Sequence, residues 1–218
     1  MELSWQCGIY IFIQQELQRV TWLLVIIRII KYNLFMINLP LIVLAAPTCS
    51  GKTEVLRHMR RNHFVGVDMG VFIKETLDLS NYVKQYSGLT LIERIELHGR
   101  ELLMSQLVNS LLATPKSPIK GYVVSGMRSN IDMELLQRYT KKKSINVFIH
   151  SDMLQRYTWS INRKRDDAPK TFLDFIRVDY EEIASGMNGL LNRFDFDIIY
   201  NNSTLEHLFR EIERRILV

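Results

Sequence analysis

The chain has 218 residues, of which 47% are hydrophobic and 23% charged. This composition fits one globular domain, with or without an appendage, and excludes wholesale disorder. The formal net charge of +5 favours an anionic partner but does not distinguish a nucleotide, a nucleic acid or a lipid surface. The two cysteines, Cys7 and Cys49, are too few for a disulfide framework, so we expect a reducing, cytoplasmic location.

Residues 1–35 form an unusually apolar extension that precedes the domain expected over 36–218. The apolar run before Arg28 is far shorter than the ~20 residues of a membrane-spanning helix. Arg28 and Lys31 lie inside or beyond this apolar stretch, whereas a signal peptide carries its positive charge before it. Two interpretations stay open: a segment not native to the working protein, produced by a start codon assigned too early, or an amphipathic helix that touches a membrane.

From Leu41 onward, segments with strand character alternate with segments of helical spacing. The expected strands are Leu41–Ala45, Phe64–Val67, Gly121–Val124, Ile145–Ile149 and Phe196–Tyr200. The expected helices are Glu54–Arg61, Leu89–Leu112, Asp132–Tyr139, Phe172–Ser185 and Leu205–Ile216. Short apolar strands that alternate with helices predict a three-layer α/β domain with a mainly parallel sheet.

The segment between the first strand and the first helix carries a Walker A pattern, G-x-x-x-x-G-K-[ST], with Ala46 in place of the first glycine. In such a loop the backbone N–H groups and the start of the helix bind phosphate oxygens, while Lys reaches the β and γ phosphates and the hydroxyl ligates Mg²⁺. The sequence therefore predicts a site for a nucleoside triphosphate. The residues expected around it are Ala46, Cys49, Ser50, Gly51, Lys52 and Thr53.

Several segments together resemble the nucleoside monophosphate kinase-like P-loop proteins, and are most similar to the dephospho-CoA-kinase-related and adenylate-kinase-like branch. The resemblance covers about residues 38–218. It implies a P-loop NTPase fold with a helical lid, and ATP and Mg²⁺ as cofactors. The matching segments are Ala46–Thr53, Val67-Asp68, Val124–Ser129, Arg156, Arg163–Asp167 and Ile199–Asn202.

Within this resemblance, Lys52 holds the transferring phosphoryl group and Thr53 holds Mg²⁺. Asp68 faces the acceptor hydroxyl or the water shell of the metal, or is simply a helix N-cap. Arg128 binds a phosphate or carboxylate of the acceptor, or is an ordinary surface arginine. The family typically has an acidic residue where this chain has Ser125, which removes the usual charged contact to the metal.

The basic stretch that follows the fourth expected strand resembles the lid of these kinases. Arg156, Arg163 and Arg165 would then close over the nucleotide and neutralise charge as the γ-phosphoryl group moves. The alternative is a solvated basic helix end, because charge runs are common on surfaces. Asn201 ends the last expected strand and is a weak candidate for a contact to the base.

Three functions follow from these residues. The first is Mg-ATP-dependent phosphoryl transfer by a P-loop kinase to a small, nucleotide-like acceptor. The second is an ATP-binding module without turnover, favoured by Ser125. The third is a tRNA prenyltransferase-like enzyme, because Pro47–Thr53 also looks like the loop of those proteins. Lys141-Lys142-Lys143 is a short basic run that leaves nucleic-acid binding open but unsupported, and the oligomeric state is not predicted.

Overall fold

A computed structural model describes residues 36–78, 95–96, 98–114, 118–163, 169 and 171–216. The contacts of the chain separate Met1–Met36 from Ile37–Val218, and all the described helices and strands lie in the second unit. The extension over residues 1–35 lies outside the described residues. Both interpretations of that extension, and the boundary after residue 35, therefore stay predictions.

Five strands form one sheet: β1 (Leu41–Ala45), β2 (Phe64–Asp68), β3 (Gly121–Ser125), β4 (Ile145–His150) and β5 (Asp197–Tyr200). Their order across the sheet is β2-β3-β1-β4-β5, and each neighbouring pair is parallel. β1 lies at the centre with all five residues buried, as expected for an apolar run covered on both faces. The expected parallel sheet is confirmed.

The described helices are α2 (Lys52–Arg61), α3 (Met69–Thr76), α5 (Arg100–Leu112), α6 (Asn130–Gln137), α7 (Met153–Asn162), α8 (Phe172–Glu182), α9 (Asn188–Arg193) and α10 (Leu205–Ile216). A π-helical turn, η1 (Ile183–Met187), joins α8 to α9. No described helix has the length and apolar character needed to cross a bilayer.

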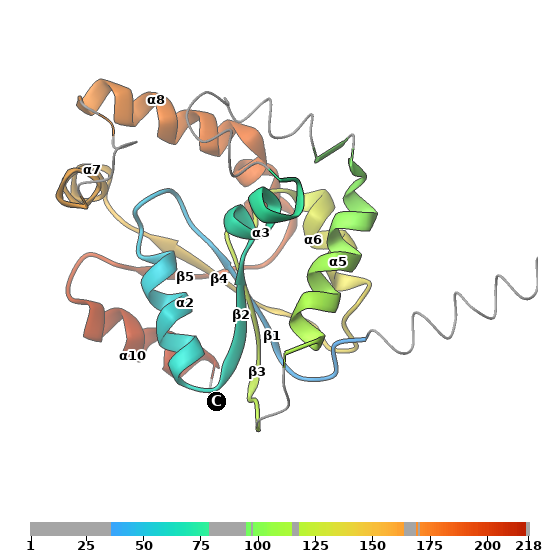
Figure 1. Cartoon of the computed structure of the whole chain (residues 1–218). Coiled ribbons are helices and arrows are strands. Elements are labelled where there is room, and N and C mark those ends of the chain that lie inside the picture. Colours follow the sequence, from blue (N-terminus) through green and yellow to red (C-terminus); the bar gives the residue numbers. More distant parts are fainter. Residues whose placement is uncertain are drawn as a thin grey trace, which may run out of the picture. The chain divides into compact units, whose positions relative to one another are not determined.

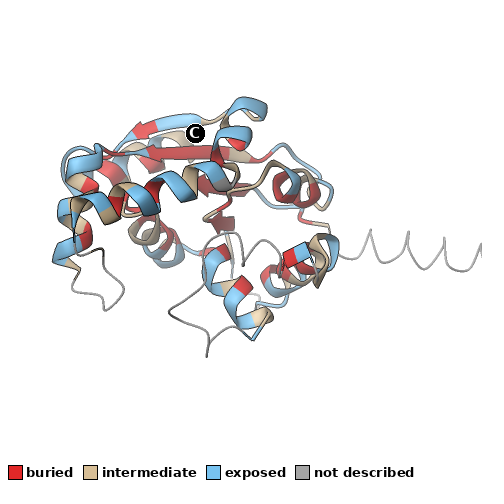
Figure 2. Cartoon of the chain, turned by 90° about the horizontal axis from the view of Figure 1, so that it is seen from above, coloured by how far each residue is buried: buried red, intermediate tan, exposed pale blue. Residues whose placement is uncertain are grey.

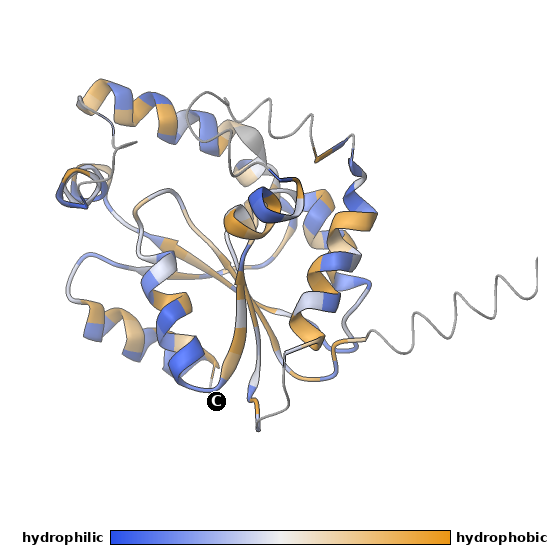
Figure 3. Cartoon of the chain, viewed as in Figure 1, coloured by the Kyte–Doolittle hydropathy of each residue, from blue (hydrophilic) through white to orange (hydrophobic). Residues whose placement is uncertain are grey.

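The sheet is the middle of three layers, with α2 and α10 on one face and α5 and α6 on the other (Figure 1). The strands β1 and β3 and most of β4 are buried, whereas the edge strand β5 is largely exposed, and the helices expose their outer sides (Figures 2 and 3). One core cluster joins alternate strand residues to the two helices of the first face; its members include Ile42, Leu44, Val55, Met59, Val147, Leu208 and Ile212. The alternation follows from the two-residue period of a strand.

Two helices, α3 and α9, were not expected from the sequence, and α7 lies in the stretch for which the resemblance implied a helical lid. The long helix expected over Leu89–Leu112 is confirmed over Arg100–Leu112 as α5, and it is interrupted at Gly99, whose φ of 91° does not fit a helix. Residues 95, 96 and 98, before this break, are helical as well. Residues 89–94 and 97 lie outside the described residues. The helix expected over Phe172–Ser185 ends as α-helix at Glu182 and continues as η1.

The order of the strands creates a topological switch point between β1 and β3. The chain moves from β1 to β2 at one edge and then returns across the sheet to β5 at the other edge. The segments that leave the adjacent strands β1 and β3 therefore lead to opposite faces of the sheet. In open α/β sheets, ligands bind at the carboxyl ends of the strands at such a point.

Candidate active site

The loop from Ala46 to Thr53 connects β1 to α2 at this point. Two of its residues have positive φ, Cys49 at 61° and Gly51 at 99°, so that successive peptide groups turn sharply before the helix starts. A Cβ atom on Gly51 would lie 2.8 Å from the side-chain nitrogen of Asn201. Glycine at position 51 is therefore required by its backbone conformation and by the closeness of its neighbour.

The Lys52 side chain folds back across this loop. Its Nζ donates hydrogen bonds to the carbonyl oxygens of Ala46 at 2.7 Å and Pro47 at 3.2 Å. Burial lowers the pKa of Lys52 from 10.5 to about 8; the neighbouring charge of Arg128 lowers this pKa too, whereas Glu182 and Asp68 raise it. Charged groups from three other segments thus act on the charge of the ammonium group.

Arg128 reaches this place from the segment after β3. Gly126 has a φ of 87°, and its N–H donates to the carbonyl oxygen of Leu44 at 2.8 Å, which holds the segment against the end of β1. The Arg128 guanidinium donates to the Glu182 carboxylate at 2.8 Å and is 40% exposed. The charge of Arg128 acts on Lys52, and its contact with an acceptor stays a prediction.

Glu182, at the end of α8, is the residue of this group that sequence reasoning missed. Its side chain is 14% exposed and belongs to the Arg128 ion pair. Its partner is distant in sequence, so no local pattern marks the pair. The sequence feature that comes nearest to indicating this contact is the glycine at position 186 in η1. Its φ is 133°, and an added Cβ would lie 2.7 Å from the Arg128 carbonyl oxygen.

Asp68 lies at the end of β2 and caps α3. Its Oδ1 accepts hydrogen bonds from the N–H groups of Gly70 at 3.0 Å and Val71 at 3.2 Å. The N-cap alternative is therefore confirmed. The carboxylate also acts on the charge of Lys52, so capping does not remove Asp68 from the site, and its part in catalysis stays a prediction.

Three serine hydroxyls are buried around the loop: Ser50 within it, Ser125 at the end of β3 and Ser151 after β4. Within the described part of the chain, the Oγ atom of each has no hydrogen-bond partner. Buried hydroxyls without partners cost free energy. Their presence on either side of β1 is the pattern expected where a polar ligand completes the hydrogen bonding.

The structure gives Arg156 a different place from the one expected. Its guanidinium is 5% exposed and forms two hydrogen bonds, of 2.5 and 2.8 Å, with the Asp179 carboxylate, while Nη1 also donates to the Thr48 carbonyl oxygen at 3.2 Å. These contacts join α7, α8 and the phosphate-binding loop. We therefore assign Arg156 to supporting the loop, because a buried and fully engaged arginine does not match a mobile lid residue.

Arg163 ends α7 beside the loop, where its Nη1 donates to the Cys49 sulfur at 3.7 Å. This places one of the expected lid arginines against the phosphate-binding loop. Arg165 lies outside the described residues. Closure of either arginine over a nucleotide stays a prediction.

Asn201 supports the loop from the end of β5. It is 3% exposed, and its side-chain nitrogen donates to the carbonyl oxygen of Ser50 at 3.0 Å. Its own N–H donates to the His150 carbonyl oxygen at 2.7 Å. The predicted contact to a base is not tested by this geometry, but the side chain is already engaged in holding the loop.

The arrangement of charges fits a triphosphate with its magnesium ion. Lys52, Arg128 and Arg163 supply positive charge, and the N-terminal end of α2 adds its dipole. Thr53 supplies a hydroxyl, and Asp68 and Glu182 supply carboxylates, which are oxygen donors of the kind that Mg²⁺ prefers. The described residues contain no cluster of three or more acidic, His or Cys side chains that can hold a metal by themselves.

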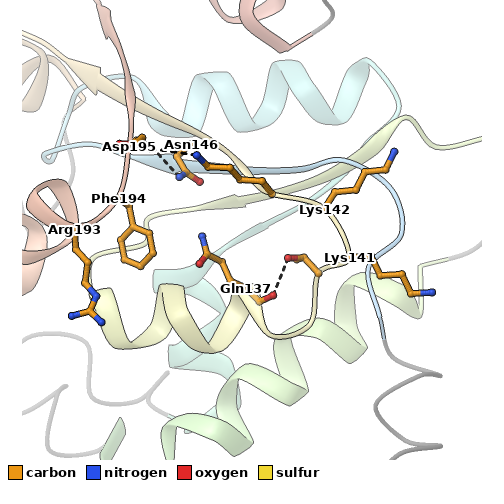
Figure 4. Close-up of a pocket in the computed structure, with 9 residues that line it drawn as sticks. Gln137, Lys141, Lys142, Asn146, Arg193, Phe194 and Asp195 are labelled. Carbon is orange, nitrogen blue, oxygen red and sulfur yellow. Dashed lines mark hydrogen bonds and ion pairs between the residues drawn. The ribbon is translucent and has the colours of Figure 1, made fainter.

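A cavity of about 440 Å³ lies at the amino-terminal ends of the strands, before the first residues of β4 and β5. Figure 4 shows the Phe194 ring and the Gln137 amide turned toward it, with Lys141 and Lys142 extending outward. Lys143 and Arg193 also line it, paired with Asp195 and Glu134 respectively. The basic run thus borders a cavity remote from the phosphate-binding loop.

The fold and the loop define a P-loop protein with the architecture of small-molecule kinases. Solved structures of similar fold include a sugar kinase from Janibacter, with a TM-score of 0.57 and 10% identity over 83% of this chain and 95% of that chain. A gluconokinase from Sinorhizobium meliloti has a TM-score of 0.53 and 10% identity over 82% of this chain and 91% of that chain. These likenesses concern the fold. No family model matches the chain.

The chain belongs to the UPF0200 family. It is 30% identical to the UPF0200 protein of Pyrococcus furiosus over 175 residues, which are 77% of this chain and 90% of that protein. The UPF0200 protein of Pyrococcus abyssi is also 30% identical, over 185 residues that cover 81% of this chain and 97% of that protein. A UPF0200 protein of Pyrobaculum aerophilum is 26% identical over 77% of this chain and 91% of that protein.

Proposed function

We propose that this protein is an Mg-ATP-dependent kinase that transfers the γ-phosphoryl group to a small, nucleotide-like acceptor, as nucleoside monophosphate kinases and dephospho-CoA kinases do. The observation that carries the proposal is the Lys52 ammonium group. It is held by two carbonyl oxygens of the loop, 2.7 and 3.2 Å away, and Arg128 acts on its charge from the segment that follows β3. This concentrates positive charge beside the start of α2.

Phosphoryl transfer asks mainly for positioning and for stabilisation of charge on the phosphoryl oxygens. Lys52 and the loop N–H groups would bind the β and γ phosphates, while Thr53 and the nearby carboxylates would hold Mg²⁺. Bound Mg²⁺ neutralises charge on the phosphate oxygens. Arg128 would orient an anionic group of the acceptor, and Arg163 would add positive charge from the end of α7.

A nucleotide-binding module without turnover is the second candidate. It is favoured by Ser125, which is buried at the end of β3 where the resembled kinases have an acidic residue. A hydroxyl can order a metal-bound water but brings no charge. The tRNA prenyltransferase-like alternative rests on the loop sequence alone, and we rank it below these two.

The test is ADP release by the full chain with Mg-ATP and a panel of acceptors. The panel contains nucleoside monophosphates, dephospho-CoA, gluconate, shikimate and short RNA and DNA. Lys52→Ala removes the ammonium group. Lys120→Ala is the matched control, because Lys120 is exposed and directly precedes β3, at the end of the sheet opposite to the loop. We expect acceptor-dependent ADP release in the wild type and the control, with a loss of at least ~100-fold in Lys52→Ala, as for other removed charge contacts in active sites.

ATP binding without turnover on any acceptor would contradict the kinase and support the module. ADP release that is unchanged in Lys52→Ala would contradict both, because it would come from another site or a contaminating enzyme. Transfer of a prenyl group to tRNA without ATP consumption would favour the third alternative.

A further inference from the structure

The cavity before the first residues of β4 and β5 has no part in the proposed phosphoryl transfer. It lies at the amino-terminal ends of these strands, whereas the phosphate-binding loop leaves the carboxyl end of β1. A strand of five or six residues spans roughly 17–20 Å, so the length of the sheet separates the two places. The volume of the cavity, about 440 Å³, is in the range of ligand pockets. The cavity is therefore a separate candidate for binding.

The charge of the cavity is predominantly positive. Four cationic side chains and one acidic side chain line it, namely Lys141, Lys142, Lys143, Arg193 and Asp195. Lys143 and Arg193 are paired with carboxylates. Lys141 and Lys142 are exposed, and within the described part of the chain neither belongs to an ion pair. Positive charge that no neighbouring carboxylate balances favours an anionic ligand.

The wall of the cavity adds an aromatic ring and an amide. Phe194 directly follows α9, and its half-buried ring is turned toward the cavity, as is the amide of Gln137 in α6 (Figure 4). The buried Asn146 in β4 holds the segment that carries the ring, because its side-chain nitrogen donates to the Asp195 carbonyl oxygen at 3.0 Å. The Ser144 hydroxyl fixes this amide in turn at 2.7 Å. The ring therefore has a supported place beside the lysines.

Positive charge beside an aromatic ring is the combination by which proteins bind single-stranded nucleic acid. The cations contact phosphates, and the ring stacks on a base in a manner that tolerates any sequence. Lys141 and Lys142 extend outward from the cavity (Figure 4), so the positive charge continues beyond the space in which a single nucleotide would lie. This arrangement fits a strand with several phosphates better than a free nucleotide. A duplex keeps its bases stacked inside, where the ring cannot reach them.

We propose that this cavity binds single-stranded nucleic acid, with one base against Phe194 and Gln137 and the neighbouring phosphates on Lys141 and Lys142. The inference goes beyond the proposed function and does not rest on it, because it involves neither ATP nor the phosphate-binding loop. It gives the basic run a role that differs from a general surface charge: the aromatic ring and the lysines act on different parts of the same ligand.

The experiment measures the binding of labelled single strands of about eight nucleotides to the full chain by fluorescence anisotropy, without ATP. RNA and DNA of the same sequence are compared, and the tighter one identifies the backbone that the site prefers. Lys141→Ala/Lys142→Ala should weaken binding at least ~10-fold at low salt. It should also reduce the slope of log affinity against log salt by about 1.4, because each phosphate contact to a single strand contributes about 0.7.

Phe194→Leu separates stacking from charge. It should weaken binding at least ~5-fold, the lower limit for a base stacked on an aromatic side chain, and leave the salt dependence unchanged. A duplex of the same sequence should bind at least ~5-fold more weakly than the single strand, because its bases cannot stack on the ring. Full affinity in Phe194→Leu, or equal affinity for duplex and single strand, overturns the inference.

Arg61→Ala/Lys120→Ala is the matched control, because it removes the same charge from two exposed positions that do not line the cavity. Its affinity should stay within ~2-fold of the wild type. An equal loss in the two double variants would mean that only the overall charge matters, and overturns the inference. So does a nucleoside monophosphate that binds as tightly as the strand, or a wild type that binds neither RNA nor DNA.

Discussion

The Arg156 guanidinium and the Asp179 carboxylate form a buried, two-bond ion pair beneath the phosphate-binding loop. Arg156 also donates to the Ser151 and Thr48 carbonyl oxygens, so one side chain connects β4, the loop and α8. The loop is therefore held from the side of α7 and α8, and from the side of β5 through Asn201.

Replacement of Asp179 by Asn should destabilise the protein strongly, because Arg156 would keep its charge in a buried place without a carboxylate. Breaking one side of a buried pair typically costs about 3–5 kcal/mol. The measurement is the free energy of unfolding in urea. Glu134→Gln is the control, since it breaks the more exposed pair with Arg193, whose side chain is 61% exposed, and should cost less than ~1 kcal/mol. Equal costs for the two variants would contradict the structural assignment of Arg156.

Removal of the Asn201 side chain should loosen the loop at Ser50. The Ser50 carbonyl oxygen would lose the donor at 3.0 Å, and a buried acceptor left without its partner costs about 1–3 kcal/mol. We expect Asn201→Ala to lower both the free energy of unfolding and the affinity for ATP. Asn202→Ala, at the exposed neighbour, should change both much less. Full stability and affinity in Asn201→Ala would show that the loop does not depend on this contact.

Two glycines close together in the sequence should respond in opposite directions to alanine. Gly186→Ala places a Cβ atom 2.7 Å from the Arg128 carbonyl oxygen at a φ of 133°. It should lower the free energy of unfolding by about 2–4 kcal/mol, because the backbone at position 186 is strained and the Arg128 backbone must move. Gly189 lies in α9 with no atom within 4 Å of an added Cβ, so Gly189→Ala should stabilise the protein by up to ~1 kcal/mol. Thermal unfolding of both variants tests this, and a stable Gly186→Ala protein would contradict the close docking of η1.

Nucleotide binding should take up a proton at mildly alkaline pH. The pKa of Lys52 is about 8 instead of 10.5, chiefly because of burial, with Glu182, Arg128 and Asp68 as the other charges that act on it. At pH 8.5, roughly three-quarters of the Lys52 side chains would then be neutral, and the bound phosphates should restore their charge. The affinity for ATP should therefore fall as the pH rises above about 8.

Calorimetry at pH 8.5 in buffers of different ionisation enthalpy measures this uptake. The lowered pKa also affects stability. Between pH 8 and 10.5, Lys52 binds more protons in the unfolded chain than in the folded chain. The contribution of Lys52 to the free energy of unfolding therefore rises with pH over that range. Proton release on ATP binding, or no transfer at all, would contradict the account of Lys52.

The sequence predicts the sheet well because its strands are short apolar runs bounded by clear changes in composition. β1 and α10 have the expected bounds, and the loop with Gly51, Lys52 and Thr53 follows β1 as its pattern requires. These features depend on local sequence. Their physical causes, burial on both faces of a strand and one apolar face of a helix, are visible in a few consecutive residues.

The roles of Arg156 and Glu182 are not predictable in this way. In the sequence, Arg156 is one residue of a basic stretch. Its ion pair with Asp179 of the next helix forms only in the folded protein. Likewise, the place of Glu182 depends on its ion pair with Arg128, which lies in the segment after β3, and on the turn at Gly186. Charged residues acquire a role from partners distant in sequence, so sequence patterns alone indicate the type of site more reliably than its complete set of residues.

The most direct test of the central claim is a titration of Mg-ATP into the wild type, Lys52→Ala and Lys120→Ala proteins, with binding measured at equilibrium. The account predicts saturable, one-to-one binding in the wild type and in Lys120→Ala, and an affinity at least ~10-fold lower in Lys52→Ala, in line with the loss of a charge-assisted contact. Equal affinities in all three proteins, or no saturable binding in the wild type, would contradict it.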